Sequence, residues 1–194
     1  MPDFSGFVLA GGRSSRMGSD KAFLEFNGRT LLARALDLLQ RLTPEVYIVG
    51  PAAKFAACGP VIEDIYTGRG PLAAIHAALS SSPTELNLML AVDLPFVTAS
   101  LLRFIVECAQ AADAMVTVPR IAGGYQPLCA VYRRDFGSLA QAALESGHNK
   151  IDALFSAAKT RVLEESELRR FAFEAGMFEN LNTPEDLRRA AEKS

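Results

Sequence analysis

Short apolar runs alternate with helical segments along most of this 194-residue chain, and this alternation constrains the fold most strongly. The first run, FVLA at residues 7–10, is continuous, which is typical of a strand buried on both faces. The next segment, 30–42, places its leucines on one stripe at helical spacing, with Arg34, Asp37 and Arg41 opposite. Strands that alternate with helices in this way predict βαβ units and a mostly parallel sheet.

The same reading predicts the remaining elements. We expect strands at 46–50, 60–65, 86–92, 114–119, 127–132 and 161–165, and helices at 70–82, 100–112, 136–147, 150–158 and 183–193. Pro71 fits the first turn of its helix, and Pro184 follows Thr183, a predicted N-cap. Ser100 is the predicted N-cap of the helix at 100–112. The segment AGGYQ at 122–126 breaks the alternation, so we expect a different sheet arrangement in the last third.

Composition indicates one globular domain over residues 1–194. With 49% hydrophobic residues the chain can bury one sizeable core. The net charge of -2 argues against a nucleic-acid or membrane-surface binder, and no apolar run approaches the roughly 20 residues of a membrane span. Cys58, Cys108 and Cys129 are interpreted as buried thiols in a reducing compartment, so we expect a cytoplasmic protein.

The loop after the first strand combines two glycines with three cations, Arg13, Arg16 and Lys21. Gly11 and Gly12 allow positive φ, and successive N–H groups in such a turn form a concave site for an anion. The guanidinium and ammonium groups add full charges. The pattern favours a phosphate-binding loop, and the alternative is a turn whose long side chains are simply solvated.

Two better-known phosphate motifs fit poorly. A P-loop requires G-x-x-x-x-G-K-[ST], but five residues separate Gly12 from Gly18 and the lysine follows Asp20. The segment GRGPLA at 68–73 fits the dinucleotide pattern G-x-G-x-x-A, although Pro71 removes an amide and the preceding DIYT is not a clean strand end. A dinucleotide-dependent oxidoreductase using NAD therefore remains a weaker alternative.

An aspartate at the end of the apolar run 86–92 indicates a metal site. Asp93 is costly in that position unless a cation pairs with it, and Mg²⁺ takes one or two protein carboxylates plus phosphate oxygens. A turn aspartate ahead of Leu94 and Pro95 is the competing interpretation. Asp64 follows another short strand in the same way, and its competing interpretation is an ordinary solvated turn. His76 is interpreted as a packed or surface residue without a role.

The stretch LAGGRSSRMGSDKAFLEFNGRTLL resembles the signature of nucleotidyltransferases of the sugar-nucleotide-transferase type. Its double glycine and RMG-x-DKA spacing are most similar to the molybdenum cofactor guanylyltransferases. Collinear matches continue through VIED, GPLAAI, VDLPF, PLCAVY and NLNTPEDL, from residue 9 to residue 187. A related cytidylyltransferase group typically carries Ala-Ala-Gly in place of Ala-Gly-Gly, so Gly11-Gly12 favours the guanylyl branch.

This resemblance implies a Rossmann-like α/β fold of the nucleotide-diphospho-sugar transferase type, with a mostly parallel sheet flanked by helices. It implies transfer of GMP from GTP to the terminal phosphate of molybdenum-loaded molybdopterin with Mg²⁺ as cofactor, and contact with chaperones or other proteins of molybdenum cofactor synthesis. Residues up to about 120 would bind the nucleotide and later residues the acceptor. The implied catalytic residues are Arg16, Lys21 and Asp93, the last also holding the metal.

The implied nucleotide-binding residues are Leu9, Ala10, Gly11, Gly12, Lys21, Asp64, Gly70, Pro71, Leu72 and Asp93, and the implied acceptor-binding residues are Lys150, Asn180 and Asn182. Each has a structural alternative: a plain helix entry at 70–72, a solvated loop around Lys150, and turn or cap asparagines at 180 and 182. The alternative functions are cytidylyl transfer from CTP, nucleotidyl transfer to another phosphorylated acceptor, and the role of a non-catalytic nucleotide-binding partner. Arg16, Lys21 and Asp93 together argue against lost activity.

Overall fold

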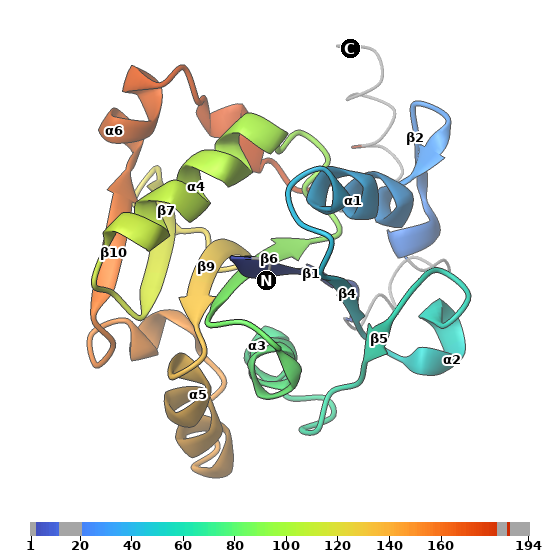
Figure 1. The fold of residues 1–194 in the computed structure, drawn as a ribbon, viewed down its shortest axis with the longest axis horizontal. Coiled ribbons are helices and arrows are strands. Elements are labelled where there is room, and N and C mark those ends of the chain that lie inside the picture. Colours follow the sequence, from blue (N-terminus) through green and yellow to red (C-terminus); the bar gives the residue numbers. More distant parts are fainter. Residues whose placement is uncertain (1–2, 12–20, 182–185, 187–194) are drawn as a thin grey trace.

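The computed structural model describes residues 3–11, 21–181 and 186. Within this part of the chain, eight strands form one sheet in the order β10-β7-β9-β6-β1-β4-β5, with β8 paired to β7 (Figure 1). The strands are β1 (Phe4–Leu9), β4 (Val46–Val49), β5 (Val61–Ile62), β6 (Leu86–Ala91), β7 (Val116–Ile121), β8 (Gly124–Tyr125), β9 (Cys129–Arg133) and β10 (Thr160–Glu164).

The strand directions confirm the predicted change in the last third. Strand β1 pairs in parallel with β4 and β6, β4 with β5, and β7 with β10. Strand β9 runs antiparallel to both β6 and β7, and β8 forms a hairpin with β7 around residues 121–124. The α/β fold with a mostly parallel sheet is therefore confirmed.

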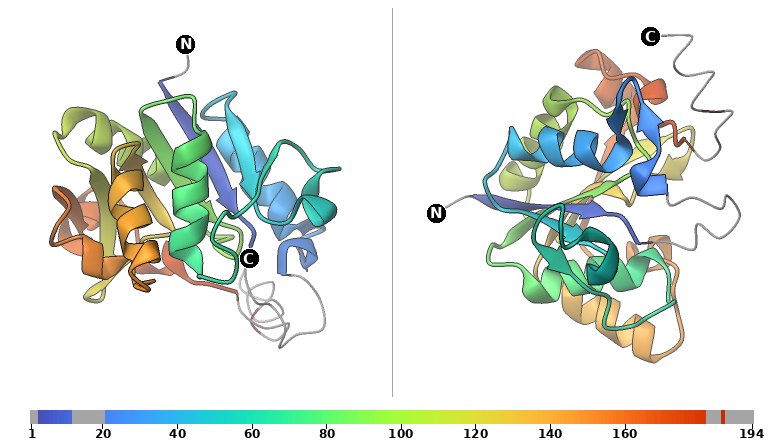
Figure 2. Two further views of the ribbon diagram at one scale, coloured as in Figure 1. Left: turned by 90° about the horizontal axis from the view of Figure 1, so that it is seen from below. Right: turned by 90° about the vertical axis from the view of Figure 1, so that its right-hand side faces the viewer.

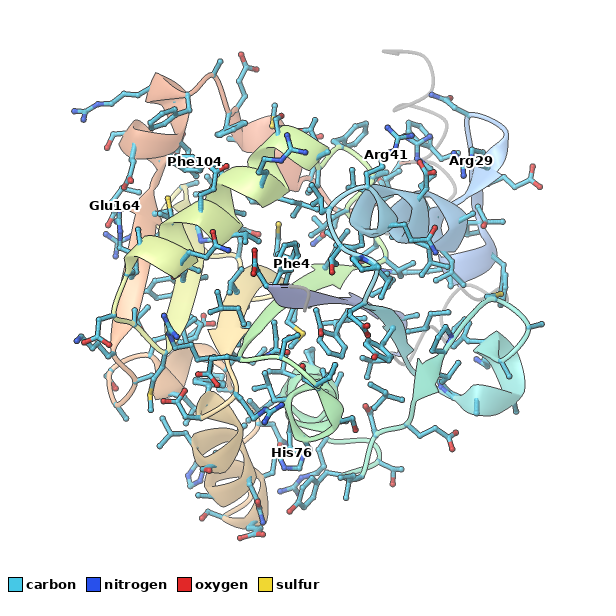
Figure 3. The ribbon with its side chains drawn as sticks, in the orientation of Figure 1. Phe4, Arg29, Arg41, His76, Phe104 and Glu164 are labelled. Atoms are coloured by element: carbon cyan, nitrogen blue, oxygen red, sulfur yellow. The ribbon has the colours of Figure 1, made fainter. Side chains whose placement is uncertain are left out.

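Helices cover both faces of the sheet (Figures 1 and 2). On one face lie α1 (Leu31–Gln40) and α4 (Ala99–Ala111), and on the other lie α3 (Pro71–Ser81) and α5 (Phe136–Glu145). Phe104 of α4 and His76 of α3 accordingly lie on opposite sides of the sheet (Figure 3). Because both faces are covered, Val8 packs into one core while Phe7 and Leu9 pack into the other, which explains the continuous apolar run.

Small elements complete the described chain: α2 (Ala52–Phe55), α6 (Glu165–Arg170), the β2 (Glu25–Phe26) and β3 (Arg29–Thr30) hairpin, and 3₁₀ turns at Lys21–Phe23, Asp152–Leu154 and Ala175–Phe178. The hairpin turns through Asn27 and Gly28, with φ of 49° and 73°. Asn-Gly is the strongest short hairpin signal, so the sequence contained this element although we did not predict it.

Two local predictions were wrong. Helix α4 begins at Ala99, so Ser100 lies inside the first turn, and the Thr98 hydroxyl oxygen accepts from the Leu101 N–H at 3.3 Å. The predicted helix at 150–158 is reduced to the 3₁₀ turn at 152–154. Ile151, Phe155 and Ala158 are buried at helical spacing, but so short a segment gains little from helix formation. The predicted helix at 183–193, with Thr183 and Pro184, lies outside the described residues.

The three cysteines are unpaired, and Cys129 is buried, but Cys58 is exposed, contrary to expectation. Cys58 follows α2 in the short connection to β5, where the chain crosses the surface. None of the described helices is long and apolar enough to cross a bilayer.

Leu88 provides a test of the core. It lies at the centre of β6 and is 0% exposed. We expect Leu88→Ala to lower the free energy of unfolding by about 2–5 kcal/mol, because a cavity would remain in a close-packed interior. The exposed Ile65, at 66%, is the matched control, and Ile65→Ala should change this free energy by less than about 0.5 kcal/mol. Urea denaturation of both variants measures the difference, and equal losses would contradict this assignment of the core.

Candidate active site

Three parallel strands, β1, β4 and β6, end at the same edge of the sheet, and predicted site residues follow β1 and β6. The Ala10 and Gly11 amides both donate to the Val49 carbonyl, at 3.0 and 3.1 Å, which fixes the start of the loop after β1 against the end of β4. The Val92 amide donates to the Leu9 carbonyl at 3.2 Å and fixes the end of β6 in the same way. Ligands bind beyond the carboxyl ends of strands in open α/β sheets, so this edge is the candidate site.

A cavity of about 400 Å³ opens at this edge, within the range of small-molecule sites. Its lining combines the loop after β1, the end of β4 and the segment after β5. The lining residues are Ala10, Gly11, Gly50, Pro51, Lys54, Glu63, Asp64, Thr67 and Gly68.

Gly50 shapes the cavity wall. A Cβ at this position would lie 2.9 Å from Phe55 Cε2 and 3.3 Å from the Gly11 nitrogen. The Phe55 ring is fully buried, so it has little room to move away. The close approach of the two strand ends therefore requires glycine at position 50.

Asp64 is the half-buried one of two acidic residues in this cavity, since Glu63 is exposed. Its Oδ1 atom is buried without a hydrogen-bond partner in the described part of the chain, and burial raises the pKa of the carboxyl group. An unsatisfied buried acceptor is costly. Asp64 lines the cavity, so its carboxylate is placed to accept a hydrogen bond from a ligand.

The second feature of the edge is an ion pair between Lys21 and Asp93. Lys21 Nζ lies 3.3 Å from Asp93 Oδ2, and the side chains are 25% and 19% exposed. Lys21 begins the 3₁₀ turn at 21–23, which the buried Ala22 anchors in the core. Asp93 follows β6, so the pair joins two segments that are 72 residues apart in the sequence.

The segment near residue 180 reaches the same place. The Leu181 amide donates to the backbone carbonyl of Asp93 at 3.0 Å, and the Leu181 side chain is buried. Asn180 is thereby held beside the Asp93 turn and is exposed.

Asp93 suits a magnesium ion that is also bound by phosphates. In the described part of the chain, no group of three His, Cys, Asp or Glu side chains forms a cage for a metal. Asp93 accepts one contact, from Lys21, through Oδ2, and no described side chain bonds to its other oxygen. Mg²⁺ is commonly held by one or two carboxylates and completed by phosphate oxygens and water, so a single carboxylate at this edge of the sheet is sufficient.

Comparison with known proteins agrees with this geometry. Residues 6–162 match the MobA-like NTP transferase domain family. The chain belongs to this family. It is 34% identical over 188 residues to a probable molybdenum cofactor guanylyltransferase of Pelotomaculum thermopropionicum, covering 96% of this chain and 91% of that one.

Other relatives extend the comparison. A molybdenum cofactor guanylyltransferase of Syntrophotalea carbinolica is 30% identical over 184 residues, covering 94% of this chain and 88% of that one. The crystal structure of molybdopterin-guanine dinucleotide biosynthesis protein A from Archaeoglobus fulgidus has a TM-score of 0.86 at 27% identity, covering 97% of both chains. The 2-C-methyl-D-erythritol 4-phosphate cytidylyltransferase of Thermus thermophilus shares the fold, with a TM-score of 0.69 at 20% identity and 96% of each chain covered.

In this MobA-like chain, the structure brings several predicted residues together. Ala10, Gly11 and Asp64 line the cavity, and Lys21 contacts Asp93 outside its lining. Leu9 is buried in the core directly before them. Gly12, Arg16 and Asn182 lie outside the described residues.

Other predicted residues lie apart from the cavity. Gly70, Pro71 and Leu72 are absent from its lining, and Leu72 is 0% exposed, so its side chain belongs to the core. Lys150 is exposed beyond α5 and makes no described contact with Lys21 or Asp93. The GRGPLA segment also lacks the strand–turn–helix form of a dinucleotide site, because β5 ends at Ile62 and Pro71 opens α3.

Sequence reasoning missed the β4 side of the cavity and part of the segment after β5, namely Gly50, Pro51, Lys54, Glu63, Thr67 and Gly68. A signal was present, because VYIVGP ends a predicted strand with glycine and proline, as FVLAGG ends the first. The carboxyl ends of parallel strands meet at one edge, so the end of β4 was a candidate.

The raised pKa of Asp64 predicts a stability effect with a defined sign. The folded state holds the Asp64 proton more tightly than the unfolded state, so ionisation destabilises the fold, and this penalty disappears as the pH falls below the raised pKa. Without nucleotide, Asp64→Asn should therefore raise the Tm at pH 7, by on the order of 2 °C, and the gain should shrink at acidic pH.

Asp113 is the matched control for this experiment, because a hydrogen bond from Lys159 lowers the pKa of its carboxyl group. Asp113→Asn should leave the Tm at pH 7 unchanged or slightly lower. Thermal unfolding at several pH values measures both variants. A Tm of Asp64→Asn below that of the parent protein at pH 7 would contradict the prediction.

Proposed function

We propose that this protein transfers GMP from GTP to the terminal phosphate of molybdenum-loaded molybdopterin, releasing pyrophosphate and forming the guanine dinucleotide cofactor. The observation that carries the proposal is the placement of a cavity with an unsatisfied carboxylate and the Lys21–Asp93 pair along one sheet edge. The relatives that match over almost their whole length are named molybdenum cofactor guanylyltransferases, and these names support the same activity.

Asp64 is proposed to recognise the nucleoside. An ionised carboxylate only accepts hydrogen bonds. The Watson–Crick edge of guanine offers two adjacent donor groups, its ring N–H and its exocyclic amine, whereas that edge of cytosine offers one amine beside acceptors. The carboxylate of Asp64, with two acceptor oxygens, therefore matches guanine better than cytosine. A thermal-shift comparison of GTP with CTP, both with Mg²⁺, tests the base preference, and equal or larger stabilisation by CTP favours cytidylyl transfer.

Lys21, Arg16 and the amide of Gly12 are proposed to bind the triphosphate. Gly11, whose own amide donates to the Val49 carbonyl, would allow the phosphates to approach the backbone closely. Asp93 would hold Mg²⁺, which when bound neutralises charge on the phosphate groups of the nucleotide. The attacking phosphate is already an anion at neutral pH, so no strong general base is needed. The residues act mainly by positioning the two anions and by stabilising the charge of the leaving pyrophosphate.

The acceptor is proposed to bind on the other side of Asp93. Asn180, held beside the Asp93 turn through Leu181, would contact it together with Asn182 and Lys150. In this proposal one domain carries both functions, with residues up to about 120 binding the nucleotide and later residues the acceptor. The protein would act in the cytoplasm and pass its product to chaperones or molybdoenzymes.

One reaction tests the proposal. The protein is mixed with Mg²⁺, GTP and molybdenum-loaded molybdopterin, and the dinucleotide and pyrophosphate are quantified. Stoichiometric formation of both is the expected result. A protein that binds GTP tightly but releases no pyrophosphate with this acceptor would not be this enzyme.

A further inference from the structure

Residues 63–70, which join β5 to α3 and which we call the nucleoside loop, form a wall of the cavity without helix or strand. Glu63, Asp64, Thr67 and Gly68 of this loop line the cavity. Gly68 and Gly70 have φ of 74° and 75°, a conformation that favours glycine. The loop must be held by contacts elsewhere, because its own backbone supplies little regular hydrogen bonding.

One such contact comes from Glu63, whose Oε1 atom accepts from the Ala52 amide at 2.8 Å, and two more come from the long side chains of Tyr66 and Arg69. The Tyr66 hydroxyl donates to Glu145 Oε1 at 3.1 Å, and Arg69 Nη2 donates to the Leu144 carbonyl at 2.6 Å. Both acceptors lie at the end of α5, which packs beside α3 (Figures 1 and 2). Tyr66 and Arg69 therefore hold the loop to α5, whereas Asp64 and Thr67 line the cavity.

The end of α5 is a suitable anchor because its backbone is fixed. Gly147 has φ of 84°, its amide donates to the Leu144 carbonyl, and the His148 amide donates to the Ala143 carbonyl at 2.8 Å. This is the glycine-terminated helix end in which the last carbonyls are satisfied. The Arg69 guanidinium adds a positive charge at a helix C-terminus, which is the favourable end for a cation.

Tyr66 is also fixed from the α3 side. Its ring contacts the His76 ring edge-on, with centroids 5.2 Å apart. His76 is 5% exposed, and burial lowers its pKa, so the imidazole is neutral at pH 7 and acts as a packing surface. This packing contact accounts for the buried position of the His76 ring, so no chemical role is assigned to it.

We propose that Arg69 and Tyr66 are positioning residues, which set the affinity for the nucleotide by holding the nucleoside loop against α5. They act through Asp64 and Thr67 and do not contact the Lys21–Asp93 pair. The inference rests on the proposed function in taking a nucleotide as the ligand of the cavity. It predicts that loss of these contacts weakens nucleotide binding and leaves the chemical step intact.

The first test measures GTP binding to the full-length protein by calorimetry, with Mg²⁺ and without acceptor. Arg69→Met keeps much of the side-chain length but removes the donors, and should weaken the Kd about tenfold. Tyr66→Phe removes one hydrogen bond and should weaken it about threefold. Arg103 on α4 is exposed, and Arg103→Met, the matched control, should bind as the parent protein does.

Steady-state kinetics separates positioning from a general structural role. Arg69→Met should raise the KM for GTP about tenfold with kcat within a factor of two, and Arg69→Lys, which retains a donor and a charge, should recover part of the loss. An unchanged Kd in Arg69→Met overturns the inference, as does an equal loss in the Lys and Met variants. Because the binding assay contains no acceptor, a parent protein that binds GTP without transferring GMP refutes only the proposed function.

Discussion

Replacement of Lys21 by alanine is expected to lower turnover by roughly two to three decades while the fold stays intact. Lys21 is a partly buried cation at the carboxyl edge of the sheet, 3.3 Å from Asp93, and in the proposed mechanism it would neutralise the pyrophosphate as it leaves. Removal of one such preorganised charge typically costs about 3 kcal/mol of transition-state stabilisation. The neighbouring Ala22 remains buried, so the 3₁₀ turn at 21–23 should persist.

Single-turnover rates at saturating GTP and Mg²⁺, together with the Tm, measure this effect. Lys159 is the matched control, because it is a lysine that also pairs with an aspartate, Asp113, but on the exposed surface between α4 and β10. Lys159→Ala should keep the rate of the parent protein. A Lys21→Ala enzyme within a factor of two of the parent would remove Lys21 from the mechanism.

Asp93→Asn is expected to weaken the response to magnesium. An amide is a poorer ligand for a hard divalent cation than a carboxylate, so the midpoint of the Mg²⁺ titration should rise roughly tenfold or more. Turnover at a fixed low Mg²⁺ concentration should fall by about two decades. The amide also weakens the contact with Lys21, so the effects of Asp93→Asn and Lys21→Ala should not add in the double variant.

Activity is titrated with Mg²⁺ in the parent, in Asp93→Asn and in Asp113→Asn. Asp113 is exposed and remote from the cavity lining, so its variant should give the parent titration curve. An unchanged curve for Asp93→Asn would show that the metal is held without this carboxylate.

Much of the fold could be predicted because hydrophobic patterns report burial. The continuous runs at β1 and β6 correctly indicated strands covered on both faces, and the stripe on α1 correctly indicated a surface helix. Capping was less predictable, since Thr98 and Ser100 are both good N-caps and only backbone geometry decides between them.

The site was predicted in part, and the missing part has a physical cause. Residues beside the first strand and after β6 carry glycine or charge patterns that indicate chemistry, as for Gly11, Lys21 and Asp93. The other wall of the cavity includes Gly50 and Pro51 and backbone from other segments. Gly50 and Pro51 can be assigned to the cavity only when it is known which strand lies next to β1. Strand order follows from the packing of the whole sheet, and residue types alone do not specify it.

The hydrogen bond between Leu181 and Asp93 has a consequence for biosynthesis. Lys21 and Asp93 are translated before Leu181, the residue that secures the Asp93 turn. In the sequence, 87 residues lie between Asp93 and Leu181. A ribosome-bound nascent chain can pair its β-strands yet still lack this last support. The Asp93 turn should therefore gain its full support only after residue 181 has been made.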